Sequence, residues 1–233
     1  MEIQESVLRN IHLLLGWRAS PRYADFRGEL TEQLRAVAGS DSEWTWDGPM
    51  TLVSGEERGI DLALSPSELI IATESPSQDL EDLPTRLAAS VLDQLAISEV
   101  RLVGAGSVWL APVADLKDLN DWLADNLGAF GKPGLYDAFG GKPSTFNFEA
   151  EIEDEDFSYD VELRSITASE AASSDDFKSD EEDSFPPAAL YLEVIRSEVG
   201  DITAAAASQA FGSNLEKALA AARKFDLALR GQL

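Results

Sequence analysis

The chain has 233 residues, 44% of them hydrophobic, and it carries 43 Asp and Glu against 18 Lys and Arg, a net charge of −25. This length and apolar fraction predict a packed core, in one large domain or two small ones. The excess of carboxylates disfavours direct binding of nucleic-acid phosphates or of an anionic membrane surface, and it favours basic proteins and cations as partners. No apolar run reaches the roughly 18 residues that a membrane span needs. Because the N-terminus also lacks the layout of a secretory signal, we expect a cytoplasmic protein.

Two residue types narrow the possible chemistry. The chain has no cysteine, which excludes disulfides, thiol catalysis and thiolate metal sites. Its only histidine, His12, lies in an apolar alternation and is expected to be a strand residue rather than a catalytic base. A zinc enzyme or a Ser-His-Asp triad is therefore disfavoured, and we predict no catalytic residue, no metal ligand and no cofactor.

The first elements are a strand and a helix. Apolar residues alternate over residues 7–17, which predicts a strand. Ser20 is a plausible N-cap, Pro21 suits the first helical position and Gly39 can end a helix, so a helix is expected between them. Its apolar residues recur at helical spacing and predict one buried stripe.

A meander, a second helix and a glycine-containing strand follow. Short strand-like runs separated by glycine and proline predict an antiparallel meander over residues 44–75, followed by a helix over residues 84–95. Residues 99–113 read as two strand pieces hinged at Gly104 and Gly106. These glycines lack the third glycine and the following helix of a dinucleotide-binding motif, so a turn or bulge is the better interpretation.

The middle of the chain contains a helix and two irregular segments. A helix is expected to start at Asp115 and to end at Gly128. Residues 129–145 are rich in glycine and proline and predict a connection between two parts of the molecule. Two Gly-Lys-Pro repeats in this connection lack the spacing of a Walker motif. Residues 167–187 are acidic and of low complexity, which is typical of a surface loop.

The C-terminal part is expected to contain a strand and a helix. Residues 188–199 return to strand character. An alanine-rich helical piece then meets Gly212, and Ser213 with Glu216 forms a capping-box pattern that predicts the start of a separate last helix, ending at Gly231.

The most unusual segment is residues 149–163, where eight of fifteen side chains are carboxylates. Apolar and acidic residues alternate on both sides of Asp154-Glu155, which predicts a hairpin with one buried face. A two-residue turn there would place Ile152 opposite Phe157 and Glu149 opposite Asp160, and a four-residue loop over residues 153–156 would keep this pairing.

Three interpretations of the acidic face remain open: a solvated surface, a metal site, or a surface for a basic protein. A calcium loop would need a glycine and a ligand spacing that residues 153–156 lack. The last helix carries four Lys and Arg against two carboxylates, which leaves open a neutralisation of the hairpin within the molecule. The candidate partner-binding residues are Glu149, Glu151, Glu153, Asp160 and Glu162.

The order of elements predicts an α+β protein, mainly of antiparallel sheet with flanking helices, whose two halves can be read as similar lobes. We expect an N-terminal α+β lobe at residues 1–128, the connection at residues 129–145, and a C-terminal part at residues 146–233 with the hairpin, the acidic loop and the terminal helix, the lobes sharing one core.

The function that best fits these features is a non-enzymatic, cytoplasmic protein-interaction module of the inhibitor, immunity, adaptor or chaperone type. It would present its acidic face to a basic protein partner. A carboxylate- and divalent-metal-dependent enzyme is the main alternative. A nucleic-acid mimic is a further one, although residues 149–183 carry a net charge of −13, about half of the total, rather than the charge being spread along a surface.

Overall fold

The computed structural model describes residues 6–74, 83–126, 147–153, 157–167 and 188–231. The strands are β1 (Val7–Gly16), β2 (Glu43–Asp47), β3 (Met50–Gly55), β4 (Ile60–Leu64), β5 (Glu68–Glu74), β6 (Glu99–Val113), β7 (Asn147–Glu153), β8 (Phe157–Thr167) and β9 (Ala188–Thr203). The helices are α1 (Arg22–Ala38), α2 (Leu83–Gln94), α3 (Leu116–Asn126) and α5 (Ala204–Leu229).

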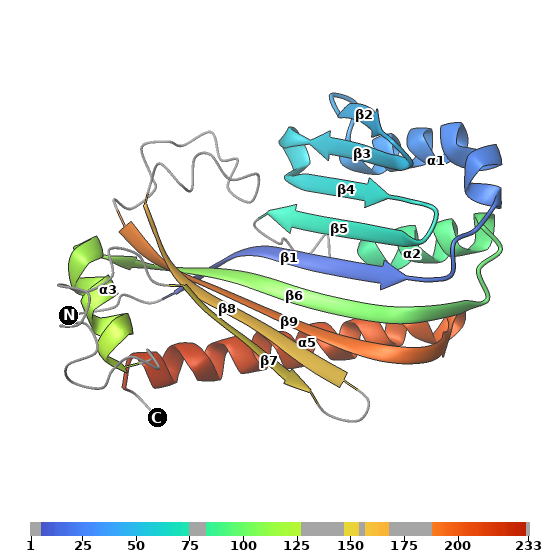
Figure 1. The fold of residues 1–233 in the computed structure, drawn as a ribbon. Helices are drawn as coiled ribbons and strands as arrows, with labels where there is room; N and C mark the ends of the chain where they lie inside the picture. The colour runs from blue at the N-terminus through green and yellow to red at the C-terminus, as the bar shows by residue number, and fades with distance from the viewer. Residues whose placement is uncertain (1–5, 75–82, 127–146, 154–156, 168–187, 232–233) are drawn as a thin grey trace.

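The nine strands form one antiparallel sheet in the order β2-β3-β4-β5-β1-β6-β9-β8-β7, which makes this an α+β protein, as its sequence predicts (Figure 1). The expected meander is present as β2 to β5. The long pairing of β6 with β9 joins the strands of the N-terminal half to those of the C-terminal half. The connection predicted at residues 129–145 and the acidic loop predicted at residues 167–187 lie outside the described residues, except for Thr167.

The four α-helices in the described part of the chain pack on one face of the sheet. The alternation of β1 directs Leu13 and Leu15 to this face, where they join a core with α1, α2 and the first turns of α5. A second core gathers under β6, β8 and β9, with α3 and the later turns of α5. Because α5 contributes Phe211 to the first core and Ala222 to the second, this one helix underlies both halves of the sheet.

The opposite face, here called the helix-free face, carries no helix in the described part of the chain (Figure 1). Part of it, near the end of β8, is nevertheless buried through Val108, Leu110 and Tyr191. One row of directly paired residues on this face crosses every strand, from Glu43 through Ser54, Asp61, Ala72, His12, Gly106, Ile195 and Asp160 to Glu151.

The glycines of residues 99–113 do not make a hinge, so that prediction was wrong. β6 runs unbroken over fifteen residues. A Cβ atom on Gly106 would lie 2.8 Å from Ile195 Cγ1 and 3.1 Å from His12 Cδ2. The glycine is therefore explained by the close approach of two neighbouring strands rather than by a turn.

Two predictions about helix starts were also wrong. Ser20 does not cap α1: Pro21 occupies the N-cap position, and the Ser20 hydroxyl donates instead to the carbonyl of Leu95, 3.2 Å away. Residues 204–229 form one helix that runs through Gly212 and Ser213, and Thr203 is its N-cap, accepting from the Ala206 amide at 3.3 Å. A continuous buried stripe explains this, since packing against the sheet outweighs a local capping pattern.

The start of α3 agrees with its prediction. The Asp115 carboxylate accepts from the backbone amides of Lys117 and Asp118 at 2.8 and 3.0 Å. The predicted end at Gly128 lies outside the described residues. No helix in the part of the chain that the structure describes has both the length and the apolar character that crossing a bilayer requires.

Candidate functional site

The five candidate acids lie together on the helix-free face of the hairpin. Glu149, Glu151 and Glu153 belong to β7, while Asp160 and Glu162 belong to β8. The apolar residues between them, such as Phe148 and Val161, pack toward α5 on the other face. The two strands pair with one acidic and one apolar face, but the apolar face is not fully buried as predicted, since Ile152 is 56% exposed.

The predicted pairing of the hairpin was wrong by two residues. Glu149 lies opposite Glu162, Glu151 opposite Asp160, and Ile152 opposite Tyr159. Since a shift of two residues keeps every side chain on its face, only the neighbours change.

Phe157 shows why the register differs. Instead of facing Ile152, it pairs with Glu198 of β9. Its ring contacts the Tyr159 ring at 5.7 Å, and the guanidinium of Arg196 lies over it at 4.5 Å. These tertiary contacts hold the start of β8 against β9. The Asp154-Glu155 turn itself lies outside the described residues.

This register puts like charges directly opposite each other. Glu162 forms an ion pair with Arg164, whose Nε lies 3.1 Å from its Oε1. Among the residues that the structure describes, no cationic side chain is within ion-pair distance of Glu149, Glu151 or Asp160. Glu149 accepts a neutral hydrogen bond from Asn147 Nδ2 at 2.8 Å.

The terminal helix does not neutralise this surface. Lys217 and Lys224 of α5 border an apolar groove with Phe148, Ile152 and Tyr159, which is the opposite face of the same hairpin. Arg230 pairs with Asp226 within α5. In the described part of the chain, the helix cations are thus separated from the acidic face by the thickness of the sheet.

A further carboxylate, Glu193 of β9, extends the acidic row. It lies opposite Glu162, which itself lies opposite Glu149. Its Oε1 is 3.0 Å from His12 Nε2, and its Oε2 accepts from the Tyr191 hydroxyl at 3.1 Å. Burial alone would raise the pKa of Glu193, but the His12 contact, the Tyr191 hydroxyl and the charge of Arg164 together hold that pKa below its usual value of 4.5.

His12 and Glu193 were missed as site residues because their partners are distant in sequence. His12 is a strand residue, as expected, and it faces the acidic surface across Gly106. Glu193 could have been found from the alternation of its strand, since Leu192 and Val194 are apolar and point to the helices. No sequence signal places it beside His12.

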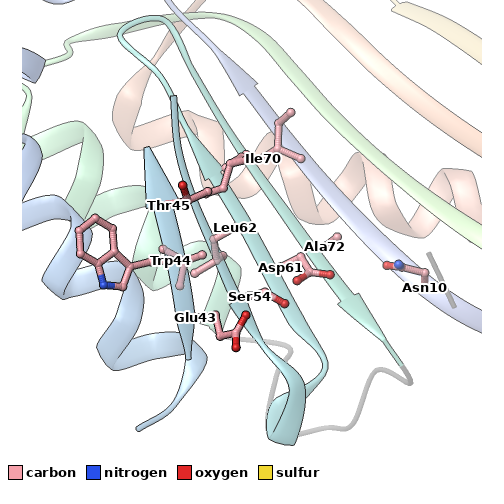
Figure 2. A pocket seen from close by; sticks show the side chains of 12 residues that line it. Asn10, Glu43, Trp44, Thr45, Ser54, Asp61, Leu62, Ile70 and Ala72 are labelled. Atoms are coloured by element: carbon pink, nitrogen blue, oxygen red, sulfur yellow. The ribbon is translucent and has the colours of Figure 1, made fainter. Parts of the chain in front are cut away.

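The N-terminal end of the helix-free face has a hollow of about 410 Å³ over β2 to β5 and β1 (Figure 2). Its floor is apolar and consists of Leu52, Ala63, Ile70 and Ala72. Polar side chains surround this floor, namely Asn10, Glu43, Thr45, Ser54 and Asp61.

Asn10 is the most unusual group of the hollow. Its side chain is only 3% exposed, and its Oδ1 has no hydrogen-bond partner among the described residues. In Figure 2 its carboxamide points from β1 toward Ala72 and Asp61. A buried acceptor without a donor costs about 1–3 kcal/mol, so a donor supplied from outside would be stabilising.

Both ends of this face present groups that can accept hydrogen bonds from a cation. The hairpin end offers carboxylates on an exposed strand surface, and the hollow offers Asp61, an amide and an apolar floor. In the described part of the chain, no three His, Cys, Asp or Glu side chains are grouped closely enough to hold a metal ion.

Comparison with known proteins adds no assignment to this geometry. No protein-family model matches the chain. No curated protein matches it significantly.

Proposed function

We propose that the protein is a non-enzymatic, cytoplasmic interaction module whose helix-free face binds a basic segment of another protein. The observation that carries this proposal is the direct opposition of Glu151 to Asp160 and of Glu162 to both Glu149 and Glu193. No described cationic side chain is within ion-pair distance of Glu149, Glu151 or Asp160.

This arrangement favours a cationic ligand for an energetic reason. Each pair of like charges directly opposite on a sheet costs on the order of 0.2–1 kcal/mol, and water and salt only reduce that cost. Lysine or arginine side chains placed over the rows would turn repulsion into attraction. They would also be drawn to the protein from a distance, because the net charge is −25.

The carboxylate enzyme is less well supported. Such a site needs two acids in a cleft, with their pKa values driven apart by burial or by a neighbouring charge. Glu151 and Asp160 do line an open hollow of about 360 Å³, but both side chains are exposed to solvent rather than buried.

The test is a charge reversal with a matched control. The double variant Glu151→Lys/Asp160→Lys changes the acidic face, and Asp93→Lys/Glu216→Lys makes the same charge change at exposed sites on α2 and α5. Each protein is immobilised and exposed to a lysate of the native host at low and high salt, and retained proteins are identified by mass spectrometry. A retained basic protein is then purified, and its Kd is measured by calorimetry.

We expect a basic protein that wild type and the control retain at low salt, that high salt releases, and that the face variant binds at least tenfold more weakly. Equal binding of that protein to all three chains would reduce the acidic face to a solvated surface. A thermal-shift series with Mg²⁺, Mn²⁺ and Ca²⁺ tests the enzyme alternative, since saturable stabilisation by one ion at low concentration would favour it.

A further inference from the structure

We infer that the hollow over β2 to β5 and β1 takes the side chain of one arginine. This inference rests on the proposed function for the source of that arginine, a basic protein segment lying on the helix-free face. It assigns to the hollow a specificity that the charged hairpin lacks.

Three polar groups define the head of the site. Asp61 lies on β4 with Ser54 opposite it on β3, and Asn10 lies on β1, with β5 between. The strands that carry Asp61 and Asn10 are two strand spacings apart, about 10 Å. On β5, Ala72 lies opposite Asp61 and Glu74 lies opposite Asn10. Ala72 is small enough to leave space above it (Figure 2). A planar group with donors on both edges fits between the carboxylate and the amide.

Guanidinium has the required donors. It carries five N–H groups in a fixed fork, so one edge can bind the Asp61 carboxylate while another N–H donates to the Asn10 carbonyl. Asn10 is almost fully buried and its Oδ1 lacks a partner among the described residues, and Asp61 has no ion pair there. The incoming group would satisfy both. An ammonium has three donors around one point and cannot span the two sides equally well.

The floor of the hollow suits the rest of an arginine side chain. Leu52, Ala63 and Ile70 are half-buried and form an apolar surface beside the polar groups. The three methylene groups of arginine can pack along this surface while the charged head stays near Asp61. A bare metal ion would gain nothing from such a floor.

The hollow is also placed to act together with the acidic hairpin. Asp61 belongs to the same row of the sheet as Asp160 and Glu151. Six strand spacings separate Asp61 from Glu151, a path of about 29 Å along the sheet. An extended basic segment of about nine residues covers that length, so one partner can reach both ends.

The experiment is an NMR titration of the full ¹⁵N-labelled chain with N-acetyl-arginine amide. We expect saturable shifts of the Ser54, Asp61 and Ala72 backbone amides and of the Asn10 side-chain amide. N-acetyl-citrulline amide has nearly the same shape without the charge and should bind at least tenfold more weakly. N-acetyl-lysine amide should bind about threefold to tenfold more weakly.

Variants identify the side chains that bind the arginine. Asp61→Asn and Asn10→Leu should each weaken arginine binding about fivefold or more, and Ala72→Ile should abolish it by filling the space above β5. The control Asp93→Asn removes an equal charge from an exposed site on α2 and should leave the dissociation constant unchanged. Because Asn10 is buried, its variant is interpreted only if its spectrum keeps the folded dispersion, whereas half-buried Asp61 gives an independent test.

Unchanged affinity in Asp61→Asn, equal binding of citrulline, or equal binding of lysine would each overturn the inference. Its failure is distinguishable from that of the proposed function. The small probe needs no partner, and Glu151→Lys/Asp160→Lys should leave it bound in the hollow. If the hairpin variant loses partner binding while the wild-type hollow binds no N-acetyl-arginine amide, only the inference about the hollow is refuted and the proposed function stands.

Discussion

The two ends of the helix-free face use negative charge in different ways. At the hairpin end, Glu151 faces Asp160 on an exposed two-stranded surface. At the other end, Asp61 has Ser54 and Ala72 as its cross-strand neighbours, and it stands beside an apolar floor and the buried amide of Asn10. The first end has a hollow of about 360 Å³ lined mainly by carboxylates, and the second has a hollow of about 410 Å³ lined mainly by apolar side chains.

This difference suggests that the hairpin end attracts a basic partner and that the other hollow selects one of its side chains. Exposed charges act over about one Debye length, roughly 8 Å at physiological salt, and they discriminate poorly among cations. A hollow with fixed donors and acceptors acts only at contact, but it distinguishes one side chain from another. Three changes test how the two ends are held together and how they differ.

The largest effect is expected from Asn214→Leu, which disturbs the support that α5 gives to both halves of the sheet. Asn214 Oδ1 accepts from buried Arg196 of β9, and its Nδ2 donates to the Val103 carbonyl of β6 at 2.9 Å. Leucine has a similar shape but leaves the guanidinium and the carbonyl without these partners. We expect the free energy of unfolding, measured in urea, to fall by about 3 kcal/mol.

The control for this change is Gln209→Leu at an exposed position of the same helix, which should alter stability by less than about 0.5 kcal/mol. Equal stability of Asn214→Leu and wild type would mean that the Asn214 hydrogen bonds add nothing to the packing of α5 against β6 and β9.

A smaller, pH-dependent loss of stability is expected from Glu193→Gln. Glu193 contacts His12, which lies between the two ends of the face. The pKa of Glu193 is lower in the folded protein than its usual 4.5, so the unfolded chain binds this proton more readily. The stabilisation is therefore present above about pH 4.5 and is lost as the pH falls through the folded-state pKa. At pH 6 the variant should be less stable by about 1 kcal/mol.

Urea unfolding between pH 6 and pH 3 measures this difference, which should shrink toward zero at the acid end. Glu153→Gln, at an exposed acid of β7, should follow the wild-type curve. A gap between Glu193→Gln and wild type that grows as the pH falls would contradict the assigned direction.

The smallest effect separates the two ends directly. Glu151→Gln removes a repulsion across the hairpin and should raise the free energy of unfolding by about 0.2–1 kcal/mol at 10 mM salt, and by almost nothing at 1 M. Asp61→Asn removes the same charge where no like charge lies opposite, and its effect should not depend on salt. A loss of stability in Glu151→Gln would show that this carboxylate has a favourable partner.

Much of the fold follows from local patterns. The alternation of residues 7–17, the meander of β2 to β5 and the Asp115 cap each depend on neighbours in sequence, and the structure contains all three. The errors occurred where a local signal competes with packing. Gly212 lies inside α5 because buried residues continue on both sides of it. Gly106 lies inside β6 because the crowding side chains of His12 and Ile195 require a residue without a Cβ atom there, not because the strand turns.

The sequence by itself determined which side chains share a face, because alternation along a strand has a period of two and needs no partner. Thus Glu149, Glu151 and Asp160 were correctly placed together on the hairpin. Only the tertiary structure decided what lies opposite each of them, since register depends on contacts such as that of Phe157 with Arg196. The same holds for Asn10 and Asp61. They are 51 residues apart in sequence, and the order of the strands makes both of them line one hollow.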